Sequence, residues 1–324
     1  MKTKLSVAAL LALAVLASAC GTKPAATTTN AGSPAAAPAV AEKKPEAKAP
    51  QTYPNAQLLA DVKWAEEHAK DANVKILDLR AKGYEQGHIP GAIAFNAGQL
   101  KDAKNNTIVG KDKFTEIFQG LGLNSDTTVL LYDEGNSNGA TRVFYALEYY
   151  GHKDKVKLLN GGYAAWQAAG KDVSTDAPAA AAAKGNFNAV PNDKLITTKE
   201  QLQKNDLQGC VLLDVRSSKE FSGEDLRGNQ NGGHLKNAVN KEWSESIEQN
   251  AADGVPKFKS YEELKASFEK IGVVKDKTVI PYCQTNVRGA HTYFTLRLLG
   301  YSDIAPYEGS WAEWGNAGDT EIVK

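Results

Sequence analysis

Short apolar runs alternate along this chain with segments whose apolar residues recur at helical spacing. The runs at 75–80 (KILDLR), 211–216 (VLLDVR) and 279–282 (VIPY) are short and bounded by charged or glycine-containing turns, which is typical of buried strands. The segments 111–123 and 261–273 instead carry apolar residues three or four positions apart, as amphipathic helices do. Strands that alternate with helices predict βα units around a mainly parallel sheet, so we expect an α/β fold.

The whole pattern is present twice. Three motifs recur in the same order: KILDLR as VLLDVR, GHIPGAIAFN as GHLKNAVN, and NGGYAAW as EGSWAEW. An ordered set of this kind indicates a duplicated domain. We expect the first copy to span residues 53–172 and the second residues 193–324, each a mainly parallel sheet flanked by helices. The segment between them, 173–192, is rich in Ala, Pro and Asn and is typical of a linker.

Charge and composition exclude some classes of partner. The chain of 324 residues has 38 basic and 38 acidic side chains, so no overall field recruits nucleic acid. Hydrophobic residues make up 42% of the chain, which is enough to give two domains a core each. Any preference for an anion therefore has to come from local charges.

The N-terminus predicts export. Residues 1–19 combine two lysines, a short apolar run and small residues, and the ASAC sequence resembles a lipoprotein signal that is cut before Cys20 and lipidated on its thiol. The alternative is ordinary cleavage after Ala19, with Cys20 left free. Residues 20–52 are rich in Ala, Pro, Thr and Lys, which indicates a disordered tether. We expect an exported, lipid-anchored protein of the cell envelope, on its periplasmic or outer face.

Cys283 follows the strand that ends at Tyr282, and the helical pattern GAHTYFTLRLLG after it stops at Gly300. Such a strand-to-helix turn points backbone N–H groups and the positive end of the helix dipole at its centre. A thiol there should ionise more readily than a free one, and Arg288 adds a positive charge. The same stretch equally fits a buried core cysteine followed by an arginine that faces solvent.

The first copy separates these two interpretations. Its counterpart of YCQTNVRGAHTYFTL is YDEGNSNGATRVFYAL, in which Asp133 stands in place of the cysteine, Glu134 adds a second acid and the loop is one residue longer. The strand, turn and helix survive there without a thiol, so packing alone does not require Cys283, and a reactive cysteine is favoured. We expect the first copy to be catalytically inactive and Arg142 to pair with one of the two neighbouring acids.

The remaining cysteine and histidines are predicted to be structural. Cys210 begins one apolar run and Cys283 ends another. If these are parallel neighbouring strands, about five residues at 3.3 Å each separate the two thiols, too far for a disulfide. The chain has no CxxC pair and no His/Cys cluster at metal-ligand spacing, so we expect no metal site. His88 and His234 occupy equivalent turns in both copies, which favours a structural role for each.

Together these motifs resemble the tandem-domain rhodanese family of sulfurtransferases, from about residue 53 to the C-terminus. The resemblance implies two rhodanese-like domains, of which the second is catalytic. It makes Cys283 the nucleophile that holds a sulfur atom as a persulfide, Arg216 a contact for the substrate anion and Asp214 a residue that orients the neighbouring loops. The backbone amides that surround the sulfur would come from the rest of the loop: Gln284, Thr285, Asn286, Val287 and Arg288.

This sequence departs from the family pattern at two places. Asn286 stands where the loop often has glycine, and GHLKNA replaces GHIPGA in the second copy. Asparagine tolerates left-handed backbone angles better than most residues, so we expect the loop to close.

The resemblance implies a two-step exchange without metal or cofactor. The Cys283 thiolate takes sulfur from a small anionic donor, thiosulfate or 3-mercaptopyruvate, and passes it to cyanide or a thiol. We favour thiosulfate as the donor and expect a monomer that contacts the membrane through its lipid. One alternative is a tethered, non-catalytic sulfur carrier. Another is a cysteine phosphatase or arsenate reductase, although these have five residues between Cys and Arg where CQTNVR has four.

Overall fold

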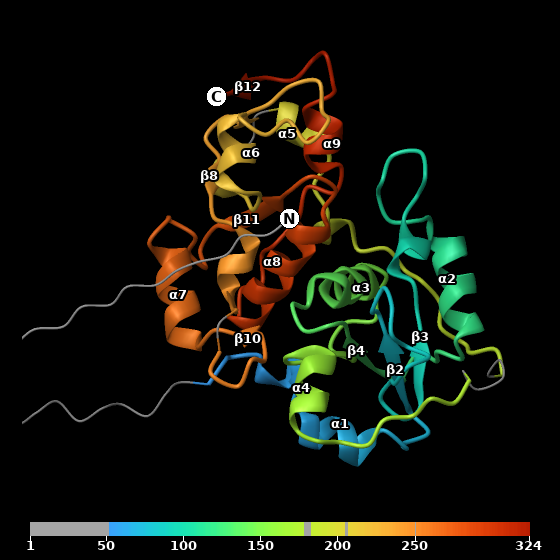
Figure 1. Cartoon of the computed structure of the whole chain (residues 1–324). Helices are drawn as coiled ribbons and strands as arrows, with labels where there is room; N and C mark the ends of the chain where they lie inside the picture. Colours follow the sequence, from blue (N-terminus) through green and yellow to red (C-terminus); the bar gives the residue numbers. More distant parts are fainter. Residues whose placement is uncertain (1–51, 178–182, 205–206, 250) are drawn as a thin grey trace, which may run out of the picture. The chain divides into compact units, whose positions relative to one another are not determined.

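The first domain is built on a parallel sheet with strand order β1-β5-β4-β2-β3, of which Figure 1 labels β2, β3 and β4. The computed structural model describes residues 52–177, 183–204, 207–249 and 251–324. The strands of this sheet are β1 (Leu59–Ala60), β2 (Val74–Asp78), β3 (Ala92–Ala94), β4 (Thr128–Tyr132) and β5 (Val156–Leu159). Its helices are α1 (Val62–His68), α2 (Lys111–Gly120), α3 (Asn138–Tyr149) and α4 (Gly162–Ala168).

The second domain repeats the central part of this arrangement. In the described residues its parallel sheet has the order β11-β6-β8, and two short antiparallel pairs, β9 with β10 and β7 with β12, lie beside it. The strands are β6 (Cys210–Asp214), β7 (His234–Leu235), β8 (Val239–Asn240), β9 (Ile247–Glu248), β10 (Lys257–Phe258), β11 (Thr278–Tyr282) and β12 (Ile322–Val323). The helices are α5 (Lys199–Gln203), α6 (Ser218–Ser222), α7 (Tyr261–Glu269), α8 (Val287–Leu298) and α9 (Ser310–Trp314). Short 3-10 turns occupy Ala56–Leu58, Ala97–Leu100, Asp193–Leu195 and Trp243–Ser246. The predicted α/β fold with mainly parallel sheets is confirmed.

Both faces of each sheet are covered, which explains the continuous apolar runs in the sequence. Ile76 and Leu77 are neighbours in β2, and they point into two different apolar clusters. Leu212 and Leu213 do the same in β6. Successive residues of a strand point to opposite faces, so a strand that is buried on both sides needs apolar residues at every position.

The register between β6 and β11 places the two cysteines of the second domain at opposite ends of the sheet. Cys210 pairs with Thr278 and Asp214 pairs with Tyr282, so Cys283 follows the far end of the neighbouring strand. Both cysteines are free. The prediction that these strands are parallel neighbours, too far apart at their cysteines for a disulfide, is confirmed.

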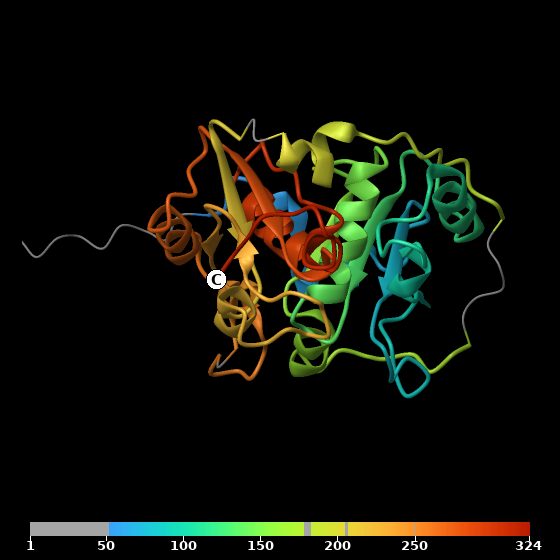
Figure 2. The same cartoon turned by 90° about the horizontal axis from the view of Figure 1, so that it is seen from above.

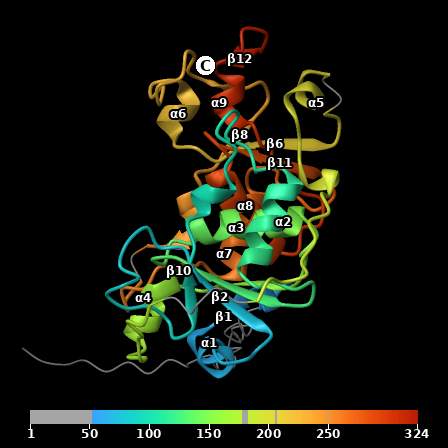
Figure 3. The ribbon, with the colours of Figure 1, turned by 90° about the vertical axis from the view of Figure 1, so that its right-hand side faces the viewer.

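Helices α3 and α8 pack against each other and join the two domains (Figures 2 and 3). The rings of Phe144 and Phe294 meet edge to face at 4.8 Å between centroids, and those of Tyr145 and Tyr293 meet at 5.1 Å. Each of these helices follows the strand-end loop that carries Cys283 in one domain and Asp133 in the other. The two loops are therefore connected through one helix pair.

The predicted signal sequence, tether and lipidated Cys20 lie outside the described residues. Within the segments that the structure describes, no helix is both long and apolar enough to cross a bilayer.

Candidate active site

The Cys283 loop connects β11, which ends at Tyr282, to α8, which begins at Val287. Asn286 is the N-cap of this helix and has φ 54° and ψ 17°, in the left-handed region. The prediction that asparagine lets this loop close is confirmed, because short polar side chains tolerate this conformation better than most.

The EGSWAEW segment lies against this loop. The backbone amide of Cys283 donates to Ser310 Oγ at 3.3 Å. The amides of Trp311 and Ala312 donate to the carbonyl oxygens of Cys283 and Gln284, both at 2.9 Å. These bonds fix the backbone on both sides of the cysteine, so its side chain is held at the start of α8.

The loop side chains differ in burial. Cys283 is 1% exposed and Asn286 is fully buried, whereas Gln284, Thr285 and Val287 are half-buried. Gln284 exchanges two amide hydrogen bonds with Asn229, at 2.8 and 3.1 Å. The loop is therefore buried at Cys283 and Asn286, and Asn229 holds the side-chain amide of Gln284.

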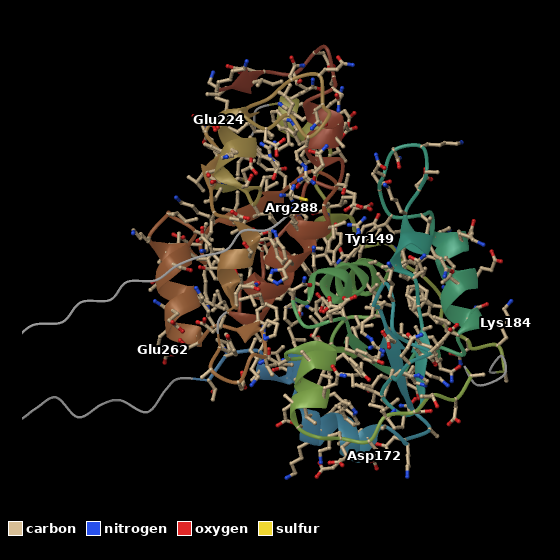
Figure 4. All side chains as sticks on the ribbon, in the orientation of Figure 1. Tyr149, Asp172, Lys184, Glu224, Glu262 and Arg288 are labelled. Carbon is tan, nitrogen blue, oxygen red and sulfur yellow. The ribbon has the colours of Figure 1, made fainter. Side chains whose placement is uncertain are left out.

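Arg288 lies in the first turn of α8, where Figure 4 labels it. Its two terminal nitrogens bind the two carboxylate oxygens of Glu220, at 2.7 and 2.8 Å. Burial lowers the pKa of Arg288, but the hydrogen bond to Glu220 and the neighbouring Cys283 outweigh it and raise the pKa. The arginine next to the cysteine is thus charged and already paired.

Glu220 is a site residue that the sequence analysis missed. It lies in α6, its side chain is 3% exposed, and it closes a capping box with Ser217 at the start of that helix. Burial raises the pKa of its carboxyl, but hydrogen bonds and charge from Arg288 and Ser217 outweigh burial and lower the pKa to about 2. The Ser-x-x-Glu spacing in RSSKEF was the available signal, since it marks a helix start in which the glutamate turns back toward the strand end.

Arg216 does not lie where the resemblance implied. It is 1% exposed, its Nε and Nη2 bind the Asp214 carboxylate at 2.9 and 2.5 Å, and Nη2 also donates to the Gly233 carbonyl at 2.7 Å. Its guanidinium carbon is 4.3 Å from the centre of the Trp311 ring. These contacts enclose the guanidinium, and the expected role as a contact for a substrate anion is corrected to a structural one.

The first domain contains the same arrangement, which supports this correction. Arg80 Nη2 binds Asp78 at 2.6 Å and the Gly87 carbonyl at 2.7 Å, and its guanidinium lies 3.6 Å from the Tyr163 ring. The motif is thus complete in a domain that has no cysteine to serve. In both domains the arginine ties the end of a strand to the Gly-His turn that follows it. Asp214 holds Arg216 in this way, and its predicted orienting role fits that position.

The histidines of these turns are also equivalent. Nδ1 of His88 lies 2.9 Å from the Tyr84 carbonyl and that of His234 lies 2.9 Å from the Phe221 carbonyl. The His88 ring also stacks on the Tyr84 ring, with 3.9 Å between centroids, and the His234 ring stacks on the Phe221 ring, at 3.6 Å. Both contacts fit the predicted structural role.

Asp133 shows what the loop does with a negative group. One of its carboxylate oxygens accepts from the amides of Gly135 and Ser137, both at 3.0 Å. The other accepts from the amides of Gly139 and Ala140, at 3.1 and 3.2 Å. Ser137 has φ 63° and caps α3 as Asn286 caps α8. The strand-to-helix turn is therefore a cradle of amides, and Cys283 occupies the corresponding place in the second domain.

Arg142 does not pair with the neighbouring acids, contrary to the prediction. Its Nη1 and Nη2 bind Glu308 of the second domain, at 3.0 and 2.5 Å. The physical reason is that amides already fill the Asp133 carboxylate, while Glu134 accepts from the backbone of Ala81 at 3.2 Å. Arg142 instead reaches across the interface to the turn before α9.

Within the described segments, no group of three or more His, Cys, Asp or Glu side chains is arranged to hold a metal ion. The chemistry that the geometry offers is that of a buried thiol in a strand-to-helix turn, next to the paired Arg288.

A duplicated α/β domain with such a loop falls into the class of proteins that carry a cysteine in an anion-binding turn between strand and helix. The chain belongs to the rhodanese family within this class, because the model of the Rhodanese-like domain matches residues 61–169 and 197–317.

Named relatives extend over most of the chain. It is 33% identical to the sulfur carrier protein TtuD of Thermus thermophilus, over 84% of this chain and 98% of that protein. It is 31% identical to the thiosulfate sulfurtransferase of Corynebacterium glutamicum, over 82% of this chain and 90% of that one. The anaerobic ergothioneine biosynthesis enzyme of Chlorobium limicola has a similar fold, with a TM-score of 0.73 and 22% identity, over 83% of this chain and 71% of that one.

Proposed function

We propose that the chain is a sulfurtransferase that carries a sulfane sulfur on Cys283. The observation that supports this most is the correspondence between the two loops. In the first domain the amide cradle surrounds a carboxylate, and in the second the same position holds a thiol, next to Arg288. A cysteine in that place can hold a sulfur atom whose negative charge the amides stabilise. Membership of the rhodanese family, with relatives named thiosulfate sulfurtransferase, points to the same reaction.

The proposed reaction has two steps that balance without a cofactor. The Cys283 thiolate attacks the outer sulfur of thiosulfate, the S–S bond of the donor breaks, and sulfite leaves with the bonding electron pair. A thiol or cyanide then attacks the outer sulfur of the Cys283 persulfide and restores the thiolate. The loop amides stabilise the charge on the persulfide, and Ser310 keeps the cysteine backbone in place.

Turnover of thiosulfate and cyanide by the purified chain tests this proposal. We expect formation of thiocyanate with the natural chain and none with Cys283→Ser. Equal rates in the two proteins would show that Cys283 does not carry the sulfur. Cys210→Ser is the matched control, because that thiol lies at the opposite end of the sheet, and its rate should equal that of the natural chain. Parallel measurements with 3-mercaptopyruvate decide the donor.

A second candidate function is that of a sulfur carrier without catalytic turnover. The relative named as a sulfur carrier protein supports it, together with the pairing of Arg288, which leaves little free charge for a small anion. After incubation with thiosulfate, intact-protein mass spectrometry should show one added sulfur atom for both functions, so the rate of thiocyanate formation distinguishes them. A carrier retains one added sulfur atom on Cys283 and passes it to a protein thiol, without sustained formation of thiocyanate.

The proposed location rests on the sequence alone. We propose that the chain is exported and anchored by a lipid on Cys20, and that its globular part is a monomer. Detergent partitioning of the natural chain and of Cys20→Ala tests the anchor, since the variant should move to the aqueous phase. Size-exclusion chromatography of the solubilised chain tests the monomer.

A further inference from the structure

The domain without cysteine, residues 53–172, binds a carboxylate of the other domain that lies beside the cysteine loop. Arg142 is the fifth residue of α3, is 7% exposed, and binds both carboxylate oxygens of Glu308. Glu308 is itself 3% exposed and precedes the segment whose amides hold Cys283 and Gln284. A two-point arginine–carboxylate pair is among the most directional contacts in proteins, so Arg142 fixes where this carboxylate lies.

The same carboxylate holds the N-cap of the cysteine loop. Asn286 Nδ2 donates to Glu308 Oε2 at 2.5 Å. The backbone amide of Ile108, again from the first domain, donates to Oε1 at 2.9 Å. One buried carboxylate therefore receives hydrogen bonds from the first domain on one side and from the capping residue of the cysteine loop on the other.

Burial makes the charge of Glu308 matter to the cysteine. A carboxylate in a buried place opposes the ionisation of a nearby thiol unless a cation compensates it. Burial lowers the pKa of Arg142, but the charge and hydrogen bonds of Glu308 raise it more, and Cys283 adds to the rise. Arg142 is therefore within electrostatic reach of both groups, and it compensates the acid next to the loop.

The other charged groups around the cysteine are already paired. They come from the elements packed around the loop: Arg288 of α8 with Glu220 of α6, and Arg216 with Asp214 at the end of β6. Tyr145 of α3 also faces this region, and burial raises its pKa well above the ordinary value, so it is neutral. Removal of Arg142 would thus leave Glu308 as the one uncompensated charge among these groups.

We propose that Arg142 is a positioning residue for Cys283. By binding Glu308 it holds the Asn286 cap in place and keeps the carboxylate from opposing the thiolate. The domain without cysteine is then a working part of the site. This inference deepens the proposed function and rests on it for its catalytic meaning, whereas its effect on the thiol is measurable without any sulfur donor.

A second ion pair between the same helices provides a matched control. Arg297 of α8 binds Glu148 of α3 at 3.0 and 2.9 Å, and the side chains are 10% and 0% exposed. Arg297 lies nine positions after Arg288 along α8, or about 13 Å at 1.5 Å per residue. Arg297→Met therefore breaks a buried pair across the same interface at a distance from the loop.

The test measures the rate at which iodoacetamide alkylates Cys283 as a function of pH, by mass mapping of the Cys283 peptide in the full chain. We expect Arg142→Met to move the midpoint of this profile upward by about one pH unit, which is roughly tenfold slower alkylation below it. Arg142→Lys should keep the midpoint near that of the natural chain, because the charge remains. The double variant Arg142→Met/Glu308→Gln should restore it, since no charge is then left unpaired.

The control and the refuting results are equally definite. Arg297→Met should leave the midpoint unchanged, even though it weakens the interface. An equal shift in Arg142→Met and Arg297→Met, or a double variant that stays shifted, would overturn the inference. Thiosulfate turnover by the natural chain is recorded separately. A chain without turnover whose midpoint still moves with Arg142 contradicts the sulfurtransferase and supports the positioning role.

Discussion

Replacement of Glu220 by glutamine removes the partner of Arg288 and has a calculable effect on stability. Burial of the Glu220 carboxyl raises its pKa, but Arg288 lowers it more, and the result is about 2, compared with 4.5 for the free side chain. The side chain is 3% exposed, so solvent screens this interaction little. A pKa lowered by this amount corresponds to about 3 kcal/mol of folding free energy.

The sign follows from the direction of this shift. The Glu220 carboxyl is a stronger acid in the folded chain than in the unfolded chain. Its contribution to the free energy of unfolding is therefore complete above pH 4.5 and is lost as the pH falls toward 2. By pH 3.5, linkage predicts that roughly 1.5 kcal/mol has been lost. The glutamine of Glu220→Gln cannot titrate, so the variant does not lose this part of the free energy of unfolding as the pH falls. This holds whatever the stability of the variant at pH 7.

Urea unfolding at pH 7 and at pH 3.5 measures the difference. We expect the free energy of unfolding of the natural chain to fall by roughly 1.5 kcal/mol more than that of Glu220→Gln over this interval. Glu224→Gln is the matched control, because Glu224 follows in the same segment and is exposed (Figure 4). Its pH dependence should equal that of the natural chain. Equal falls in the natural chain and in Glu220→Gln would refute the assigned pair.

Three further changes test the loop and the interface. Asn286→Gly keeps the left-handed cap but loses the hydrogen bond to Glu308. Asn286→Val loses the same bond and also strains the backbone by about 1–2 kcal/mol. The free energy of unfolding in urea should therefore be lower for the valine variant than for the glycine variant by this amount. Gly289→Ala places a methyl group against Asn286 Oδ1, so we expect a lower kcat in thiosulfate turnover, although alanine favours the helix by about 1 kcal/mol. Arg297→Met leaves Glu148 buried without its cation and should cost about 3–5 kcal/mol in thermal or urea unfolding, part of which Glu148→Gln recovers in the double variant.

The strands and the closed loop were predictable because they depend on local sequence. Apolar runs of strand length predicted β6 and β11, and the tolerance of asparagine for left-handed backbone angles predicted that the loop before α8 closes. Cys210 begins one apolar run and Cys283 follows another, which predicted opposite ends of the sheet for parallel neighbouring strands. In each case the deciding forces act between neighbours in sequence or between strands of regular geometry.

The partners of the charged residues were not predictable in this way. Two acids stand within the ten positions before Arg142, yet it binds Glu308, 166 residues away, because loop amides take up the Asp133 carboxylate. Glu220 and Arg288 lie 68 positions apart and meet through tertiary packing. Arg216 is the exception, because a signal was present. The same LD-x-R motif stands in the copy without cysteine, which argues for a structural role.

The two central helices also differ in the charge that each places beside the strand-end loop of the opposite domain. Arg142 and His291 are each the fifth residue of their helix, so they occupy corresponding places in α3 and α8. Arg142 carries a charge to Glu308 beside the cysteine loop. His291 is fully buried and stacks on Phe258 at 5.2 Å, and burial lowers its pKa to about 3, so it is neutral near pH 7. Of these two corresponding residues, only the one in the domain without cysteine therefore places a charge beside the strand-end loop of the opposite domain. This asymmetry gives a physical reason to retain the first domain, since without Arg142 the Glu308 carboxylate would lie unpaired beside the cap of the cysteine loop.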